Sequence, residues 1–211
     1  MVDKQPEMLV SEIISAEDQD VLGEICNISM GTAAETLSLI LQHTVHIDTP
    51  NVTVFTWNGL RDIYGSTAVG VRVGYEVGLS GSNILLLKDR DVKIITDIMM
   101  GGAGNVEEPI ELNEMDMSAI SEAMNQMVGS TATSLSSMLK KKVDISPPQA
   151  FNIDFSTEEN QYLVGVVSSQ PIAMVDFNMK IGNLISSEVV QIFNMDAALE
   201  LVNTLKQSMF G

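Results

Sequence analysis

The sequence predicts an α+β fold: an antiparallel sheet covered by helices, built from a unit that occurs twice and is related by internal pseudo-twofold symmetry. Three observations predict it. A long stretch of helical periodicity that starts near residue 16 is matched by a second one 98 residues later. Each is followed by apolar runs of strand length and then by a short amphipathic helix. The links between later runs are too short for parallel crossovers, which favours hairpins.

The repeat is clearest when residues 20–50 are aligned with 118–148, which gives ten identities. Roughly two would be expected by chance at ordinary composition. The identical pairs are Glu24/Glu122, Asn27/Asn125, Gly31/Gly129, Ala34/Ala132, Leu37/Leu135, Ser38/Ser136, Leu41/Leu139, Val45/Val143, Ile47/Ile145 and Pro50/Pro148. A weaker similarity, at an offset of 105, aligns 81–99 with 186–204. The change of offset implies a net insertion of seven residues in the second copy, near the polar segment 156–161.

The individual elements follow from periodicity and from the turn residues between them. Helical periodicity marks long and short helices, and apolar runs bounded by Gly, Pro or polar clusters mark strands. In the first half we expect a helix over 16–42, strands over 45–56, 66–74 and 77–87, and a helix over 89–100. In the second half we expect a helix over 113–141, strands over 143–154, 162–168, 172–181 and 184–193, and a helix over 195–208.

The domain organisation follows from these elements. The segment 100–116 has the glycines, proline and acidic residues of a connector between the halves. With 211 residues the chain can bury a full core as one large domain. We expect a flexible leader over 1–15 and a single domain over 16–211, made of the repeats 16–105 and 113–211.

The charge balance limits the possible partners. There are 11 Lys and Arg residues against 28 Asp and Glu, which gives a net charge of -17. Nucleic acids and anionic membranes are bound by clustered positive charge, and the only basic cluster, Lys140 to Lys142, ends a predicted helix. We therefore expect no nucleic-acid binding. No apolar run is long enough to span a bilayer, and the single cysteine, Cys26, fits a reducing cytoplasm as a small buried hydrophobe.

One face of each long helix carries the same polar residues, because positions i, i+3 and i+4 lie on one side of a helix. These two polar faces are Asp20, Glu24, Asn27 and Gly31 in the first repeat, and Ser118, Glu122, Asn125 and Gly129 in the second. On the opposite faces we expect Leu22, Ile25, Ser29, Ile120, Ala123 and Met127 to face the sheet. A solvated surface would explain one such polar face. Neighbouring positions such as Ile28/Gln126 differ between the repeats while Glu and Asn match, which favours a function.

The full spacing in each repeat resembles the signature of the CheC/CheX/FliY phosphatases of bacterial chemotaxis. It occurs as Asp20-x3-Glu24-x2-Asn27-x22-Pro50 and again as Ser118-x3-Glu122-x2-Asn125-x22-Pro148. The resemblance covers nearly the whole chain. It implies that the two long helices lie on one side of the sheet and present their polar faces to a partner. That partner would be the response regulator CheY, whose aspartyl phosphate the protein would hydrolyse.

The resemblance also implies a role for each matched residue. Asn27 and Asn125 would each orient the attacking water, and Glu24 and Glu122 would each pair with the active-site lysine of CheY. Asp20, Ser118, Gly31, Gly129, Pro50 and Pro148 would support the two sites. Mg²⁺ would come with CheY, so we expect no cofactor and no metal site on this chain.

Within the family, the leader favours the phosphatase module of a FliY-type flagellar switch protein over CheC. The implied partners are phosphorylated CheY, together with flagellar switch proteins for a FliY module or a CheD-type regulator for CheC. The implied location is the cytoplasm, at the switch of the flagellar basal body. Because the chain ends at Gly211, directly after the last predicted helix, we expect either a trimmed module or a CheC-like protein with a leader.

Two other hypotheses remain open. The first is an adaptor module of the flagellar switch that binds CheY or motor subunits without turnover. The second is an unrelated hydrolase with paired carboxylates, which is weaker because the two halves share no second acid at a consistent spacing.

Overall fold

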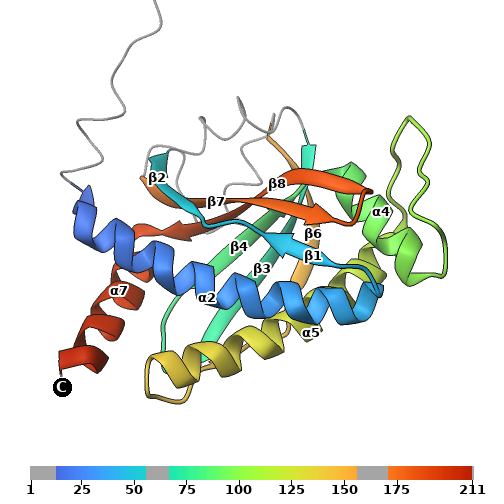
Figure 1. Cartoon of the computed structure of the whole chain (residues 1–211). Helices are drawn as coiled ribbons and strands as arrows, with labels where there is room; N and C mark the ends of the chain where they lie inside the picture. Colours follow the sequence, from blue (N-terminus) through green and yellow to red (C-terminus); the bar gives the residue numbers. More distant parts are fainter. Residues whose placement is uncertain (1–12, 56–66, 156–170, 211) are drawn as a thin grey trace, which may run out of the picture.

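The computed structural model describes residues 13–55, 67–155 and 171–210 (Figure 1). In chain order the elements are α2 (Ala16–Leu41), β1 (Val45–Ile47), β2 (Asn51–Phe55), β3 (Thr67–Val77), β4 (Ser82–Leu87), α4 (Asp89–Met99), α5 (Glu114–Met138), β5 (Asp144–Ile145), β6 (Gln149–Asp154), β7 (Ile172–Ile181), β8 (Ile185–Asn194) and α7 (Met195–Phe210). The predicted strand over 162–168, the polar segment 156–161 and most of the leader over 1–15 lie outside the described residues.

The strands form one antiparallel sheet of eight strands, in the order β1-β7-β8-β4-β3-β5, with β2 also beside β7 and β6 also beside β3. Each half contributes one hairpin, β3–β4 or β7–β8, and β4 pairs with β8 to join the halves. The strands that follow each long helix cross to the other half: β1 and β2 pair with β7, while β5 and β6 pair with β3. This arrangement confirms the predicted α+β fold and its duplicated unit.

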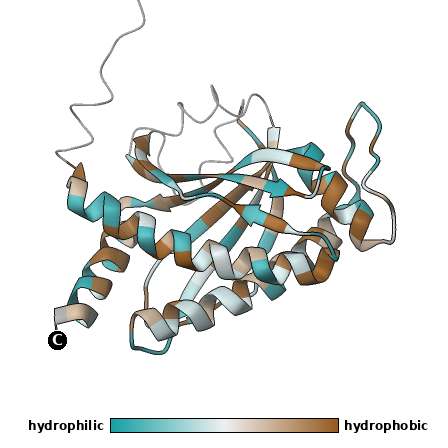
Figure 2. Ribbon diagram, viewed as in Figure 1, coloured by the Kyte–Doolittle hydropathy of each residue, from teal (hydrophilic) through white to brown (hydrophobic). Residues whose placement is uncertain are grey.

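The four helices of the described residues all cover one face of this sheet. Residues of α2, α4, α5 and α7 share a single hydrophobic core with alternate residues of the strands. The second apolar cluster lies on the opposite face and contains no residue of these helices. Figure 1 shows α2 and α5 side by side and antiparallel beneath the sheet. Much of α5 is pale in Figure 2, because its second half is built from Gly, Ser, Thr and Ala.

The strand register corrects the predicted correspondence between the later parts of the two halves. Asn51 pairs with Asp176, and Gln149 pairs with Arg72. Because Gln149 follows Asn51 by the 98 residues of the helix repeat, Asp176 must correspond to Arg72, which is an offset of 104 residues. The offset of 105, predicted only for 81–99 and 186–204, therefore does not extend back to β3 and β7.

The same correction applies to β4 and β8. Leu85 and Gln191 point to the helices, whereas Val190 belongs to the cluster on the opposite face. An offset of 105 would match Leu85 with Val190, and a slip of one residue reverses the direction of every side chain in a strand. An offset of 106 keeps the faces matched and aligns Lys88 with Asn194, the residues directly before α4 and α7.

The limits of three predicted strands are also corrected. The strands predicted over 45–56 and 143–154 are each divided in two, at Pro50 and Pro148, because proline has no N–H for the ladder. The strand predicted over 77–87 begins only at residue 82, because β3 continues to Val77. The turn lies at 78–81, where Gly78 and Gly81 have φ of 86° and 83°.

None of the helices in the described part of the chain is both long enough and apolar enough to cross a membrane.

Candidate functional site

The two polar faces predicted on the long helices lie at the surface of the protein. On α2, Asp20, Glu24 and Gly31 are exposed and Asn27 is half-buried. On α5 the four corresponding residues, Ser118, Glu122, Asn125 and Gly129, are all exposed. The residues predicted to face the sheet are buried, as predicted: Leu22, Ile25, Ser29, Ile120, Ala123 and Met127. Cys26, next to Asn27 in the chain, is 2% exposed, and burial raises the pKa of its thiol.

The fold accounts for many of the identities between the two repeats. Ala34, Leu37 and Leu41 are buried in the core beneath the sheet. The Ser38 hydroxyl accepts a hydrogen bond of 2.9 Å from the backbone N–H of Val45 and so ties the end of α2 to β1. Ser136 accepts the equivalent bond from Val143, also at 2.9 Å. Packing and loop closure therefore explain why these positions match.

The fold does not account for the matched Glu, Asn and Gly. The side chains of Glu24, Asn27 and Asn125 make no hydrogen bond or ion pair with another described residue. Glu122 accepts one bond, of 2.9 Å, from Gln126 on its own helix. A Cβ atom added at Gly31 or Gly129 would meet nothing within 4 Å. These residues are therefore available to a partner from outside the chain.

A cavity of about 280 Å³ lies beside the proline that ends the motif, 23 residues after Asn27. It lies between α2 and the link from β1 to β2. Its walls include Asp20, Glu24 and Asn27 from the helix, Pro50 from the link and Asn51 from the start of β2. Pro50 thus lies beside the polar face of α2. In the sequence, only the spacing of the motif connects the two. α5 contacts β6 as α2 contacts β2, so Pro148 lies in the corresponding link of the second half.

The two sites differ in charge and in one hydrogen bond. Asp20 and Glu24 give the first site two carboxylates, whereas Ser118 and Glu122 give the second site only one. Gln126 binds the carboxylate of Glu122, and the corresponding residue in the first site is Ile28. Neither α2 nor α5 contains a single Lys or Arg. The helix pair therefore presents only negative charge, and more of it at the first site.

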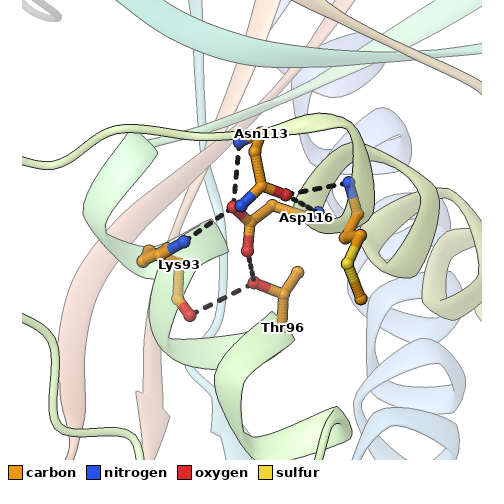
Figure 3. A network of polar contacts seen from close by, with 5 residues as sticks. Lys93, Thr96, Asn113 and Asp116 are labelled. Carbon is orange, nitrogen blue, oxygen red and sulfur yellow. Dashed lines mark hydrogen bonds and ion pairs between the residues drawn. The ribbon is translucent and has the colours of Figure 1, made fainter.

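The start of α5 is fixed by a buried acid that sequence analysis did not identify (Figure 3). Asp116 is fully buried and accepts hydrogen bonds from Lys93, at 2.7 Å, and Thr96, at 2.9 Å, both on α4. It also accepts a bond from the backbone of Asn113, whose side chain caps the helix in return. Burial raises the pKa of Asp116, but these hydrogen bonds outweigh burial and hold the pKa below its usual value.

The start of α2 is anchored in a similar way. Asp18 corresponds to Asp116 and forms an ion pair of 2.8 Å with Lys206 on α7. The hydrogen bond from Lys206, together with one from Ser15, lowers the pKa of Asp18. Each long helix is therefore held, six residues before the glutamate of its Glu-Asn pair, by a lysine from a short helix of the other half. The sequence signal was present, because Ser15 to Asp18 and Asn113 to Asp116 both have capping-box spacing.

The described residues contain no group of three or more His, Cys, Asp or Glu side chains that could hold a metal ion. The expectation that this chain carries no metal remains a prediction.

Comparison with known proteins places the chain among relatives of one kind. The model of the CheC-like family matches residues 17–54 and 115–151, which is one match in each repeat. The flagellar motor switch phosphatase FliY of Bacillus subtilis is 39% identical over 204 residues, covering 97% of this chain and 53% of that protein. The chain thus spans about half the length of that relative.

Two further relatives support the same grouping. The CheY-P phosphatase CheC of Bacillus subtilis is 24% identical over 139 residues, which cover 64% of this chain and 66% of that protein. The crystal structure of Thermotoga maritima FliY superimposes with a TM-score of 0.83 at 38% identity. That match covers 92% of this chain and 98% of that one.

We predict that Asp116→Asn lowers the free energy of unfolding at pH 7 by about 2 kcal/mol or more, because it leaves the Lys93 charge without its partner. The pKa of Asp116 is lowered in the folded protein, so its stabilisation is present above about pH 4 and is lost as the pH falls further. Chemical denaturation between pH 7 and pH 3 should show the two proteins converging in acid. Asp20→Asn, at an exposed position, is the control and should change stability little. An equal deficit at both pH values would contradict this prediction.

We also predict that Gly31→Ala and Gly129→Ala each raise the free energy of unfolding, by about 0.5–1 kcal/mol. Alanine favours the helix over glycine, and no neighbouring atom obstructs the new methyl group. Gly78→Ala is the contrasting variant, because its positive φ and the carbonyl of Lys142 leave no place for a Cβ. Thermal and urea unfolding of the three variants test this, and a loss of stability in the helix variants would show that the two glycines have an internal packing role.

Proposed function

The chain belongs to the CheC-like family, and from this membership we propose that it hydrolyses the aspartyl phosphate of the response regulator CheY. The family assignment confirms the resemblance that the paired motifs indicate. One observation carries the proposal: Glu and Asn recur at the same register on two surface helices, yet neither pair has a role in holding the fold together. The names of the relatives, flagellar motor switch phosphatase and CheY-P phosphatase, support the same reaction.

In the proposed reaction, a water oxygen attacks phosphorus as the bond from phosphorus to the aspartyl oxygen breaks. The products are inorganic phosphate, the free carboxylate of CheY and a proton. Asn27 or Asn125 would hold the water in line, since a carboxamide can both accept from and donate to it. Phosphoryl transfer passes through a loose transition state, so positioning supplies much of the acceleration. A carboxylate at the same place would repel the phosphate.

Glu24 and Glu122 would fix the register of docking. Each lies one helical turn before its asparagine and is exposed. An ion pair with a lysine in the active site of CheY would place the asparagine over the phosphate. Mg²⁺ on CheY would neutralise the developing charge, so the reaction needs no metal from this chain. Gly31 and Gly129 leave the helix surface low beside each pair, which gives the partner room to approach.

We further propose that the protein works in the cytoplasm at the flagellar switch, with phosphorylated CheY and switch proteins as its partners. The 39% identity with a flagellar motor switch phosphatase supports this assignment. The same comparison favours a FliY-type module over CheC, because the identity with CheC is 24% over a shorter stretch.

The asparagine pair provides the decisive test. We predict that Asn27→Ala combined with Asn125→Ala abolishes the acceleration of phospho-CheY decay, while each single variant keeps the activity of its intact site. The measurement is phosphate release from phosphorylated CheY over time. Asn203→Ala, an exposed amide on α7, is the matched control and should retain full activity.

Two results would count against the catalytic assignment. If the double variant matched the wild type, the asparagines would not orient the water. If the wild type itself did not accelerate decay but bound CheY in a manner that survived both substitutions, the adaptor hypothesis would be favoured instead.

The charge difference predicts that the two sites respond differently to salt. With Asn125→Ala the first site acts alone, and with Asn27→Ala the second does. Removing one carboxylate by Asp20→Ser should lower kcat/KM of the first site by roughly threefold at low ionic strength, with little change in kcat. Ser118→Asp should raise that of the second site by a similar factor. Both effects should vanish near 1 M salt, and effects that persist there would show that these residues act through geometry.

A further inference from the structure

A small, partly open cavity lies between the two long helices and the sheet. Its volume is about 50 Å³. Cys26 and Met124 line it from the helix side, and these residues directly precede the two site asparagines in the chain. From the sheet side it is lined by Tyr75 on β3, Asn83 on β4 and Gln191 on β8. Most of its remaining lining is apolar.

The polar groups of this cavity do not satisfy one another. The amide of Asn83 donates a hydrogen bond of 2.9 Å to the Tyr75 oxygen. The phenol accepts this bond, so its own O–H is still free to donate, and no described residue accepts it. Gln191 is 9% exposed, and its buried Oε1 accepts no hydrogen bond from any described residue. One donor and one acceptor are therefore left over in the same cavity.

The left-over groups would carry a penalty in a dry cavity. A buried polar atom without a partner destabilises a protein because it loses its hydrogen bonds to water on folding and gains none in return. A water molecule needs about 10–15 Å³ of such space and two or more polar partners, so this cavity of about 50 Å³ has room for about three to five waters. Burial raises the pKa of Tyr75, which keeps the phenol neutral and able to donate.

We propose that this cavity is a binding site for a water-sized neutral molecule, occupied by ordered water, which accepts from the Tyr75 hydroxyl and donates to the Gln191 carboxamide. The site links β3 to β8 without any direct contact between the two side chains. It lies beneath both long helices and is lined by Cys26 and Met124, each of which directly precedes a site asparagine in the chain. The bound water is therefore part of the layer against which both helices pack.

The symmetry-related positions of the fold show that this polarity is not required by the architecture. At the offsets of 104 and 106 residues that the strand register gives, Tyr75 corresponds to Met179, and Asn83 corresponds to Val189. Gln191 corresponds to Leu85, which is its own neighbour across the β4–β8 pair. All three counterparts are apolar and buried. The symmetric scaffold thus accepts apolar side chains at these places, and the polar set occurs at only one of the two symmetry-related places.

The direction in which a single substitution, Gln191→Leu, shifts the thermal midpoint distinguishes a hydrated cavity from a dry one. Gln191→Leu copies the residue that the fold already accepts at Leu85. If water satisfies Gln191, the variant loses the bridge and strands the Tyr75 hydroxyl, so its thermal midpoint falls. If the cavity is dry, the variant removes an unpaired buried amide, and its midpoint rises by about 2 °C or more. An unchanged or higher midpoint would overturn the proposal.

A double-mutant cycle excludes a simple packing defect as the cause of a fall. Tyr75→Phe removes the donor of the bridge. It also removes the acceptor of the Asn83 hydrogen bond, but this loss is the same whether residue 191 is Gln or Leu. The bridge is lost in either single variant, so the fall in midpoint of Tyr75→Phe/Gln191→Leu should be smaller than the two single falls together, by about 2 °C or more. Leu85→Met changes the same wall without touching the bridge, and its effect should add to that of Tyr75→Phe. Strict additivity in both pairs would contradict a shared water.

Direct detection completes the test. Dipolar NMR cross-peaks between water and the Gln191 side-chain amide should be present in the wild type and absent from Tyr75→Phe, which keeps that amide but removes the donor of the bridge. A wild type without them, at a temperature where other buried waters are seen, would overturn the proposal. These measurements require no CheY, so their outcome is independent of the phosphatase activity.

Discussion

The structure depends on the exchange of strands between the two halves. Among the described residues, β1 and β2, which follow the first long helix, pair with β7, while β5 and β6 pair with β3. A half on its own would keep its hairpin but lose the partner of every strand that follows its helix. Backbone groups in a sheet must be paired, so the two halves form their sheet together or not at all. Because the exchange fixes the edge strands, it also fixes the helices that precede them.

This dependence explains where precision at the two polar faces comes from. α2 and α5 are each tied at the far end to a strand by a serine hydroxyl, Ser38 or Ser136. At the near end an aspartate, Asp18 or Asp116, is held by a lysine of a short helix from the other half. A helix fixed at both ends presents its side chains at a defined height and angle. Positioning of this kind is what an in-line attack by water requires.

Sequence reasoning predicted the features that have a local signal. Helical periodicity gave both long helices to within a few residues, and the spacing from Asn27 to Pro50 gave two distant parts of one site. It failed where the answer depends on partners far away in the chain. The offset of 105 came from similar residue types in two apolar runs. Only strand pairing shows that Leu85 and Val190 point to opposite faces of the sheet. No local pattern marks the unpaired oxygen of Gln191, because the residues around it come from three other strands and from three helices.

The symmetry of the scaffold and the asymmetry of its chemistry have different origins. Antiparallel helices related by a pseudo-twofold place Asn27 and Asn125 roughly 15–20 Å apart along their axes, which is less than the width of a small domain. Two partners could not share that space if both sites faced the same way. The first polar face adjoins Pro50 and β2 at one edge of the sheet, however, whereas α5 contacts β6 at the opposite edge. The duplicated fold therefore places its two sites beside opposite edges of the sheet, and their charges differ, as Asp20 and Ser118 show.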